Sequence, residues 1–421
     1  MPYVVPLVIK SSGLRKARLT PCGNFEDKSM FAEGSLFAPG LGETAFKALL
    51  FFKTYYRLGS FSVDIKQCFL NNDWKDSLNP RKISMLLSEF ISGTGKKEIA
   101  ACMSEQYGLR SAPGEWSRQE DRFMIELGYK QSAIFRKVFM KFSPNGGLMI
   151  IGWQTDDGFC VHSLVEAGML LKMQFLTALK AKWECTIKDK VDQYLGIDLI
   201  YNEDQSLSML QSDMIIKVKE KCEFNDDVKA EYLSLPKGYS GLVSSQSPKI
   251  DPKKYQEILG QMAFLRYTRS ESPAQSFLAS KAHDPSEADL DALYHFARFI
   301  WTTRHVPLTF YPGPIDANID VPMEFNAWSD AAESDHNIER RMHIAWIIKG
   351  GPRGHPGGGI VTKNKQQPGV VADSVPIGEL HTQLQCSKDA VNLRHFGEEL
   401  ANRTEGNTIL EDNTSYFSWT R

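Results

Sequence analysis

The stretch GLMIIGWQTDDGFCVHS, residues 147–163, decides how this sequence is interpreted. Two apolar runs flank a polar step that contains Asp-Gly, a pair typical of the turn of a β-hairpin. The predicted hairpin places two adjacent carboxylates, Asp156 and Asp157, at its tip. Neighbouring negative charges raise each other's pKa unless water or a cation compensates them. The pair therefore indicates either a metal site or a solvated turn, and Asp and Gly are also ordinary turn residues.

A third carboxylate stands in SFSVDIKQCFL, residues 60–70, where apolar Phe61, Val63 and Ile65 alternate with polar residues. This alternation predicts a strand with Asp64 on the face opposite the apolar side chains. Nucleotidyl transfer through two divalent ions needs carboxylates on rigid elements. Asp64 stands 92 residues before Asp156, enough for a helical excursion and a return to the same sheet. The three carboxylates could hold the ions if their two strands were neighbours.

The composition is that of an ordinary globular protein, with 421 residues, 42% hydrophobic and 24% charged. No apolar run is long enough to span a bilayer and the start lacks the order of a signal peptide, so we expect no membrane partner and an intracellular protein that is not secreted. Seven scattered cysteines indicate neither a disulfide framework nor a structural zinc site. The net charge of −2 shows no basic excess. Local basic clusters, around Lys16 and around Lys188, are consistent with nucleic-acid contact or with solvated faces.

Periodicity predicts the order of elements. Helical spacing occurs in 43–59, 117–129 and 166–183, and strand patterns follow at 193–202 and 206–211. Turn formers dominate 225–255, which we interpret as a linker before further helices. A final block begins near residue 322 with two strands, a long helix and a last strand.

That final block carries a second acidic set. Asp330 lies on a predicted strand, Glu379 in the first turn of the long helix, and Asp412 at the end of TILEDN. A nuclease that cuts a phosphodiester with two metal ions needs such a trio. With 51 Asp and Glu in the chain, three acidic residues can also be selected by chance.

The order of several motifs resembles the reverse transcriptases of copia-type retrotransposons. SVDIKQCFLNND is similar to the family's DVKTAFLNGD, EQYGLRSAPGEW to LYGLKQAPRAW, and TDDG takes the place of YVDD. QYLGIDL is similar to YFLGIEI. In the last block WSDAA, KNKQ, VADSVPIGEL and EDN follow the order of the ribonuclease H motifs SDAD, SKKQ, VALSSTEAEY and DN. The resemblance covers nearly the whole chain.

The resemblance implies an α+β fold: right-hand polymerase fingers and palm over 1–225, a linker and helical thumb or connection region over 226–320, and an incomplete, C-terminally truncated ribonuclease H-like domain over 321–421. It implies an RNA-directed DNA polymerase that acts on an RNA template, a DNA primer, an RNA–DNA hybrid and dNTPs. Other parts of a retroelement polyprotein are implied partners, in a cytoplasmic particle or the nucleus. Two Mg²⁺ ions per active site, with Mn²⁺ as the alternative, would be held by Asp64, Asp156 and Asp157 and by Asp330, Glu379 and Asp412.

The resemblance also implies a nucleotide site. Its residues would be Lys16, Arg18, Lys47, Phe69, Tyr107, Gly108 and Arg110. The basic residues would approach the triphosphate. Phe69 would lie under the incoming sugar, although a core position suits a phenylalanine equally well.

Some positions depart from the family pattern without removing a metal ligand. Gln154 replaces an aromatic residue before the Asp pair, Ser270 and Glu271 replace Pro-Asp, and Met342 replaces a serine. The usual closing ligand of a ribonuclease H fold is not found after Asp412. Two alternatives therefore stay open: a catalytically decayed remnant that at most binds nucleic acid, and an unrelated metal-dependent hydrolase, which would leave the ordered motifs unexplained.

Overall fold

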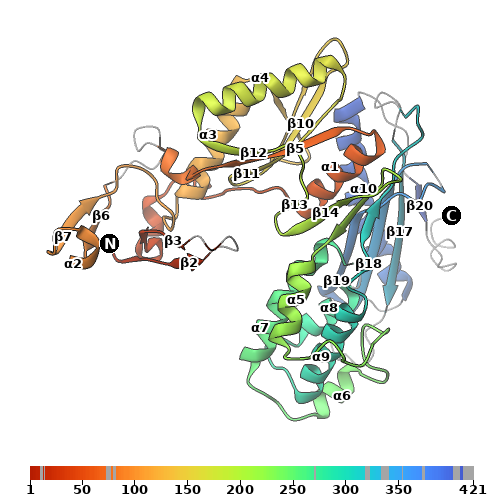
Figure 1. The fold of residues 1–421 in the computed structure, drawn as a ribbon. Helices are drawn as coiled ribbons and strands as arrows, with labels where there is room; N and C mark the ends of the chain where they lie inside the picture. The colour runs from red at the N-terminus through yellow and green to blue at the C-terminus, as the bar shows by residue number, and fades with distance from the viewer. Residues whose placement is uncertain are drawn as a thin grey trace. The chain divides into compact units, whose positions relative to one another are not determined.

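A computed structural model describes residues 1–9, 13, 15–72, 77–78, 82–269, 272–317, 323–332, 341–352, 354–371, 375–401 and 408–410. The chain forms two compact units of mixed α and β structure (Figure 1). Unit 1 contains residues 1–42 and 59–190, and unit 2 contains residues 43–58 and 191–421. The predicted domain boundaries after 225 and 320 do not coincide with this division.

Unit 1 is built on a six-stranded antiparallel sheet. In spatial order its strands are β12 (Cys185–Lys188), β5 (Gly59–Ile65), β11 (Asp157–His162), β10 (Leu148–Gln154), β9 (Val138–Phe142) and β8 (Lys130–Gln131). The predicted strand around Asp64 and the predicted hairpin around the Asp pair are thus central neighbours in one sheet.

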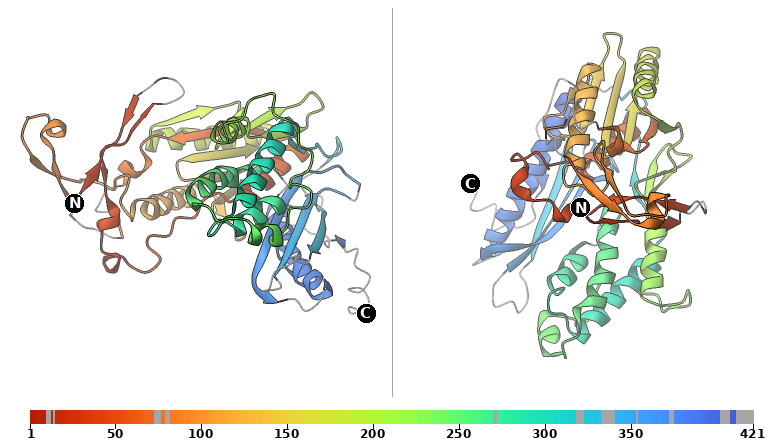
Figure 2. Two further views of the ribbon diagram at one scale, coloured as in Figure 1. Left: turned by 90° about the horizontal axis from the view of Figure 1, so that it is seen from below. Right: turned by 90° about the vertical axis from the view of Figure 1, so that its left-hand side faces the viewer.

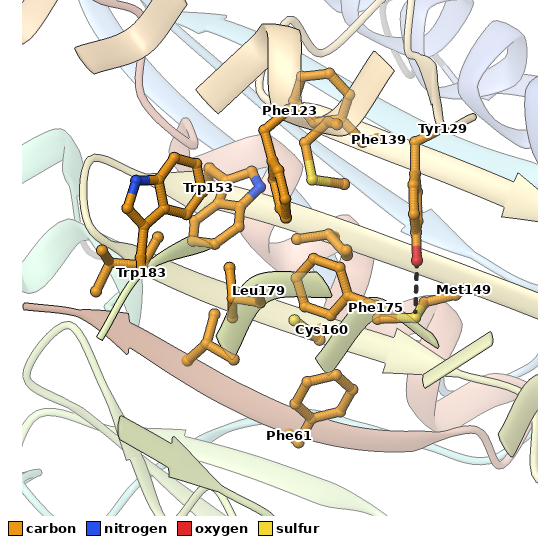
Figure 3. Packing of buried hydrophobic residues seen from close by; sticks show 14 of the residues in the cluster. Phe61, Phe123, Tyr129, Phe139, Met149, Trp153, Cys160, Phe175, Leu179 and Trp183 are labelled. Carbon is orange, nitrogen blue, oxygen red and sulfur yellow. Dashed lines mark hydrogen bonds between the residues drawn. The ribbon is translucent and has the colours of Figure 1, made fainter. Parts of the chain in front are cut away.

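Helices α3 (Ala112–Glu126) and α4 (Glu166–Lys182) contribute to the core on one face of this sheet. Phe61 and Trp153 of the sheet pack there with Phe123 of α3 and Phe175 of α4, as Figure 3 shows. Successive residues of a strand point to opposite faces. Asp64 therefore lies on the face away from these helices, and it is exposed while the residues on either side of it are buried.

The rest of unit 1 consists of short elements. Three two-stranded pairs join β1 (Tyr3–Val4) to β4 (Thr20–Pro21), β2 (Leu7–Ile9) to β3 (Arg15–Ala17), and β6 (Ser84–Leu87) to β7 (Glu98–Ala101). Helix α2 (Glu89–Ser92) and the 3₁₀ turns η1 (Gly23–Phe25), η2 (Lys28–Met30) and η3 (Cys68–Asn71) complete it. A small core that includes Ile83, Met85 and Leu109 packs against residues of β1, β6 and η3, so these elements share one apolar cluster.

Unit 2 begins with α1 (Glu43–Tyr55) and resumes with a sheet of β13 (Gln193–Tyr194), β14 (Ile197–Tyr201), β15 (Leu207–Leu210) and β16 (Leu308–Phe310). The helices between β15 and β16 are α5 (Ser212–Lys221), α6 (Gly241–Gln246), α7 (Pro252–Ala263), the 3₁₀ turn η5 (Phe264–Tyr267), α8 (Ser272–Ser280) and α9 (Glu287–Thr302). Residues of α5, α7, α8 and α9 form one core.

The linker prediction for 225–255 is wrong in part, because α6 and the start of α7 lie inside it. Tyr239 and Ser244 donate their hydroxyl hydrogens to the buried carboxylate of Asp289 in α9. The turn formers that suggested a linker include the helix caps Ser240 and Asp251. The segment is therefore a packed part of unit 2.

A second sheet of unit 2 has the order β19 (Gly359–Val371), β18 (Arg341–Gly350), β17 (Phe325–Ala332), β20 (Thr408–Leu410). Among the described pairs of this sheet, β17–β20 is parallel and the other two are antiparallel. The long helix α10 (Val375–Ala401) packs on β17 and β18 (Figure 2). Within the described residues, no helix has both the length and the apolar character that crossing a membrane requires.

Candidate active site

Strand pairing brings Asp64 and Asp157 together. The two residues are direct Cα partners across the β5–β11 pair. The Ile65 N–H donates a hydrogen bond of 2.9 Å to the carbonyl oxygen of Asp156, which fastens the hairpin tip to β5. Three carboxylates from two distant parts of the sequence therefore meet at one end of two adjacent strands. Asp64 is exposed, and Asp156 and Asp157 are half-buried.

The turn lies two residues earlier than the sequence predicted. Gln154 pairs with Asp157, so Thr155 and Asp156 form the two-residue loop and the Asp157–Gly158 step belongs to β11. Thr155 has a φ of +57°, which is unusual for a β-branched residue. Its carbonyl oxygen accepts a hydrogen bond of 2.8 Å from the indole N–H of Trp116 in α3, and this bond helps to hold the uncommon backbone conformation.

Gly158 is explained by close packing. A Cβ atom at this position would lie 2.7 Å from Val63 Cγ2 and 2.8 Å from a ring carbon of Trp153. The glycine that suggested a turn instead leaves room for the Val63 and Trp153 side chains beside the carboxylates.

The acidic groups repel one another in this position. Burial, followed by the charges of Asp156 and Asp64, raises the pKa of Asp157 to about 6, against an opposing effect of Lys188. Burial and the Asp64 charge also raise the pKa of Asp156, while Arg18 and Lys16 act in the opposite direction. The site thus favours added positive charge.

The ligand chemistry of the site suits a hard cation. Carboxylate oxygen is the ligand type that Mg²⁺ prefers. The nearby thiol of Cys68 stays protonated, because burial and the Asp156 charge raise its pKa to about 12. Among the described residues, no three Asp, Glu, His or Cys side chains already form a closed metal cluster. A bound ion would therefore have to draw the carboxylates of Asp64, Asp156 and Asp157 together.

Three of the predicted nucleotide-site residues form a stack. The Arg18 guanidinium lies over the Tyr107 ring at 4.2 Å, and the Phe69 and Tyr107 ring centroids are 4.8 Å apart. Burial and the neighbouring Cys68 raise the pKa of Tyr107, so its hydroxyl is un-ionised at neutral pH. Phe69 also packs against both cores of unit 1, so the structure gives it a packing role in addition to any contact with a sugar.

Lys16, Gly108 and Arg110 are the remaining predicted nucleotide-site residues of unit 1. Lys16 is half-buried on β3. Gly108 has a φ of +101°, and a Cβ there would lie 2.4 Å from the carbonyl oxygen of Pro21. The Arg110 guanidinium donates to the carbonyl oxygen of Asn24 at 3.0 Å, and its backbone N–H donates to Glu26. Gly108 and Arg110 thus tie their loop to the N-terminal segment.

Lys47 lies in α1 and therefore belongs to unit 2, whereas the other predicted nucleotide-site residues belong to unit 1. Only 1% of its surface is exposed, and its ammonium pairs with Glu43 at 2.8 Å. Burial lowers the pKa of Lys47. This environment is that of a structural ion pair inside a helix, and nothing in it favours contact with a triphosphate.

The second acidic set is described only in part. Asp330 is exposed on β17 opposite Ala345, and Glu379 is 4% exposed in α10. Strand β20 runs beside β17 as far as the pair Trp328–Leu410. Asp412 lies outside the described residues.

Sequence reasoning did not assign roles to Trp116 and Lys188. Trp116 supports the turn from α3, and Lys188 on β12 carries a charge that opposes the raised pKa of Asp157. A signal existed for Lys188, since it belongs to a basic cluster adjacent to a predicted strand. The tie from Trp116 to Thr155 spans 39 residues and has no local signature.

Comparison with known proteins identifies a family over the first part of the chain. The sequence model of the family described as "Reverse transcriptase (RNA-dependent DNA polymerase)" matches residues 11–233, over half of the chain. This range contains Asp64, Asp156 and Asp157.

Two curated proteins are similar to this chain. A protein of Saccharomyces cerevisiae named for transposon Ty5-1 is 21% identical over 256 residues, which cover 60% of this chain and 79% of the relative. The retrovirus-related Pol polyprotein from transposon RE1 of Arabidopsis thaliana is 20% identical over 374 residues, 85% of this chain but only 23% of the polyprotein. The crystal structure of prototype foamy virus protease-reverse transcriptase aligns with the whole chain at 11% identity and a TM-score of 0.29, covering 46% of that protein.

Proposed function

Because the chain belongs to the reverse transcriptase (RNA-dependent DNA polymerase) family, we propose that Asp64, Asp156 and Asp157 hold two magnesium ions in a nucleotidyl-transfer site. The observation that carries the proposal is the pairing of Asp64 with Asp157 across β5 and β11, with Asp156 at the adjoining loop. Manganese is the alternative ion, since it also prefers oxygen ligands.

Such ions, when bound, would activate the primer 3′-hydroxyl and neutralise the leaving pyrophosphate. The residues of the chain contribute position and charge. The central strands β5 and β11 hold two of the carboxylates on rigid elements. The raised pKa of Asp157 means that ion binding would be coupled to the release of protons near pH 6.

The basic and aromatic residues of unit 1 fit a nucleotide beside the carboxylates. Arg18 and Lys16 influence the Asp156 carboxylate and carry charge that a triphosphate would attract. The stack of Arg18, Tyr107 and Phe69 keeps these side chains ordered. We propose dNTPs, an RNA template and a DNA primer as substrates, and other parts of a retroelement polyprotein as partners.

For the C-terminal sheet we propose a ribonuclease H-like fold that meets the RNA–DNA hybrid. Support comes from the antiparallel strands β17 to β19, the parallel strand β20 and the packing of α10 on β17 and β18. Asp330 would be accessible to an ion, whereas Glu379 is buried. The polymerase proposal does not depend on this assignment.

Primer extension tests the polymerase proposal. The purified chain, given a primed RNA template, dNTPs and magnesium, should extend the primer, and Asp156→Asn should lower the rate at least ~100-fold because it removes a metal ligand. Glu33→Gln is the control, since it neutralises an exposed carboxylate of the same unit and should leave the rate unchanged. Extension by Asp156→Asn at the unmodified rate would refute the assignment of the site.

A further inference from the structure

A cavity of about 290 Å³, lined mainly by polar and charged residues, lies beside α3 in unit 1 and contains none of the three paired carboxylates. The residues that matter for its chemistry are Asn72, Glu115, Arg118, Gln119, Arg122 and Lys182. They come from the end of η3, from α3 and from the last turn of α4. The proposed function gives this cavity no role.

One carboxylate of the cavity is already satisfied. Glu115 accepts hydrogen bonds from the Ser77 hydroxyl at 2.8 Å and the Leu78 N–H at 2.9 Å. An ion pair of 2.9 Å also joins it to Arg118, whose other terminal nitrogen donates to the carbonyl oxygen of Ser35. Glu115 and Arg118 therefore neutralise each other and contribute little net charge to a ligand.

Two exposed cations remain at the cavity. Within the described part of the chain, neither Arg122 nor Lys182 forms an ion pair. The Lys182 ammonium is held 5.0 Å from the ring centroids of both Phe123 and Trp183. A cation–π contact orients an ammonium without cancelling its charge. Against these two cations the lining offers one further carboxylate, Glu126, so the cavity favours an anion.

Two amide side chains of the lining each have one buried atom without a hydrogen-bond partner in the described structure. Asn72 is 5% exposed, and its Nδ2 makes no hydrogen bond in the described structure. The Gln119 Nε2 donates to the carbonyl oxygen of Asn71 at 3.3 Å, which leaves its buried Oε1 without a donor. Buried amide groups without partners cost free energy, so both would gain from a ligand. Such a ligand would bring an acceptor for Asn72 and a hydroxyl donor for Gln119.

We propose that this cavity binds a ribose-phosphate unit, with Arg122 and Lys182 facing the phosphate and Asn72 and Gln119 facing the sugar. A phosphate supplies the negative charge and acceptor oxygens, and a ribose supplies the hydroxyl donor. The unit can come from an RNA strand or from a free ribonucleotide. An RNA strand as the source rests on the proposed function, whereas the chemistry of the cavity does not.

Equilibrium binding by the full chain in EDTA tests the proposal, because chelation removes metal-dependent nucleotide binding at the carboxylate site. The probes are a labelled single-stranded RNA and AMP. Lys182→Gln and Arg122→Gln should each weaken binding of the true ligand by about threefold or more and, for RNA, lower the salt dependence by about one counterion. Lys180→Gln is the matched control, since it removes an equal charge from the same last turn of α4 and does not line the cavity.

The two probes separate the two sources. If Lys182→Gln and Arg122→Gln weaken the binding of AMP alone, the ligand is a free ribonucleotide. If they weaken the binding of RNA, the ligand is an RNA strand. Equal behaviour of Lys182→Gln and Lys180→Gln with both probes would overturn the site, and inorganic phosphate binding as tightly as AMP would overturn the role of the sugar. Primer extension with magnesium, measured separately, shows whether the polymerase proposal stands in either case.

Discussion

Asp157 shows at the scale of one residue how a site for a cation differs from a solvated turn. A carboxylate in water has a pKa near 4, whereas burial and the charges of Asp156 and Asp64 bring that of Asp157 to about 6. The cause is the pairing of two strands, each carrying an acidic residue at the same register position. The position lowers the stability of the metal-free protein in exchange for a place where a cation can bind.

Replacing Asp157 by Asn should therefore stabilise the metal-free protein at neutral pH. An acid whose pKa is raised by folding does not lower the free energy of unfolding at a pH below its unfolded pKa. The loss of stability grows as the pH rises through the folded pKa of about 6. At pH 7.5 the gain in free energy of unfolding should be on the order of 1–2 kcal/mol after allowance for solvent screening, and it should vanish below about pH 4. Thermal unfolding in EDTA across this pH range measures it.

Asp189→Asn is a control of opposite sign. The hydrogen bond and charge of Lys172 lower the pKa of Asp189, so its contribution to stability is present above the unfolded pKa and lost as pH falls. This substitution should slightly destabilise unit 1 at neutral pH. A destabilising effect of Asp157→Asn in EDTA at pH 7.5 would contradict the described electrostatics.

At the scale of elements, the hairpin of β10 and β11 and its neighbour β5 position the site. Gly158 leaves room for the side chains of Val63 and Trp153, with which a Cβ atom would collide. Thr155 takes up the turn with a positive φ, supported by Trp116. The geometry of the carboxylates thus depends on packing beneath the strands as well as on their hydrogen bonds.

Gly158→Ala should destabilise the protein by about 1–3 kcal/mol, because the added methyl group overpacks a core contact. Denaturant unfolding measures this loss. Gly42→Ala is the matched control, since a Cβ at Gly42 meets nothing within 4 Å and should change stability by less than about 0.5 kcal/mol. Equal stability of the two variants would show that β5 and β11 have room at this position.

Local sequence patterns predicted the strands themselves better than they predicted which strands pair with each other. The alternation of Phe61, Val63 and Ile65 correctly placed Asp64 on the opposite face, because strand geometry is local. The turn was predicted at Asp157–Gly158 because Asp-Gly is the commoner turn pair, while the buried support from Trp116 favours Thr155–Asp156. The contact between β5 and β11 could not be predicted from local sequence, since it depends on long-range pairing.

At the scale of the whole molecule, α1 was predicted correctly as a helix but belongs to a unit that sequence order did not suggest. Arg57, just after α1, donates to the carbonyl oxygens of Gly313 and Pro314 at 2.7 and 2.8 Å. The Phe52 ring lies 5.7 Å from that of Phe396 in α10, in an edge-to-face arrangement. These partners come from more than 250 residues later, which no local pattern reports. Because these partners lie so far along the sequence, Lys47 was predicted to join the N-terminal basic residues in a nucleotide site.

A double-mutant cycle tests this arrangement. Phe52→Ala and Phe396→Ala should show a coupling energy of about 0.5–1.5 kcal/mol. Either substitution alone removes the edge-to-face contact, so the double variant loses it no further. Phe52→Ala combined with Phe299→Ala should be additive, since Phe299 belongs to the separate core of α5 and α7 to α9. Denaturant unfolding of the full chain gives the free energies. Additivity of the Phe52 and Phe396 substitutions would refute the placement of α1.

The early position of α1 in the chain has a consequence for synthesis. Phe46, Phe51 and Phe52 are almost wholly buried in the finished protein, and Phe51 packs against Gly350, about 300 residues further on. At translation rates of about 5–20 residues per second, this apolar helix leaves the ribosome roughly 15–60 s before Gly350 is made. Phe396, which contacts Phe52, is made later still. During that interval unit 1, whose residues precede and follow α1 in the sequence, can fold while α1 still lacks these partners. We therefore expect chaperones that bind exposed aromatic segments to bind α1 of the nascent chain.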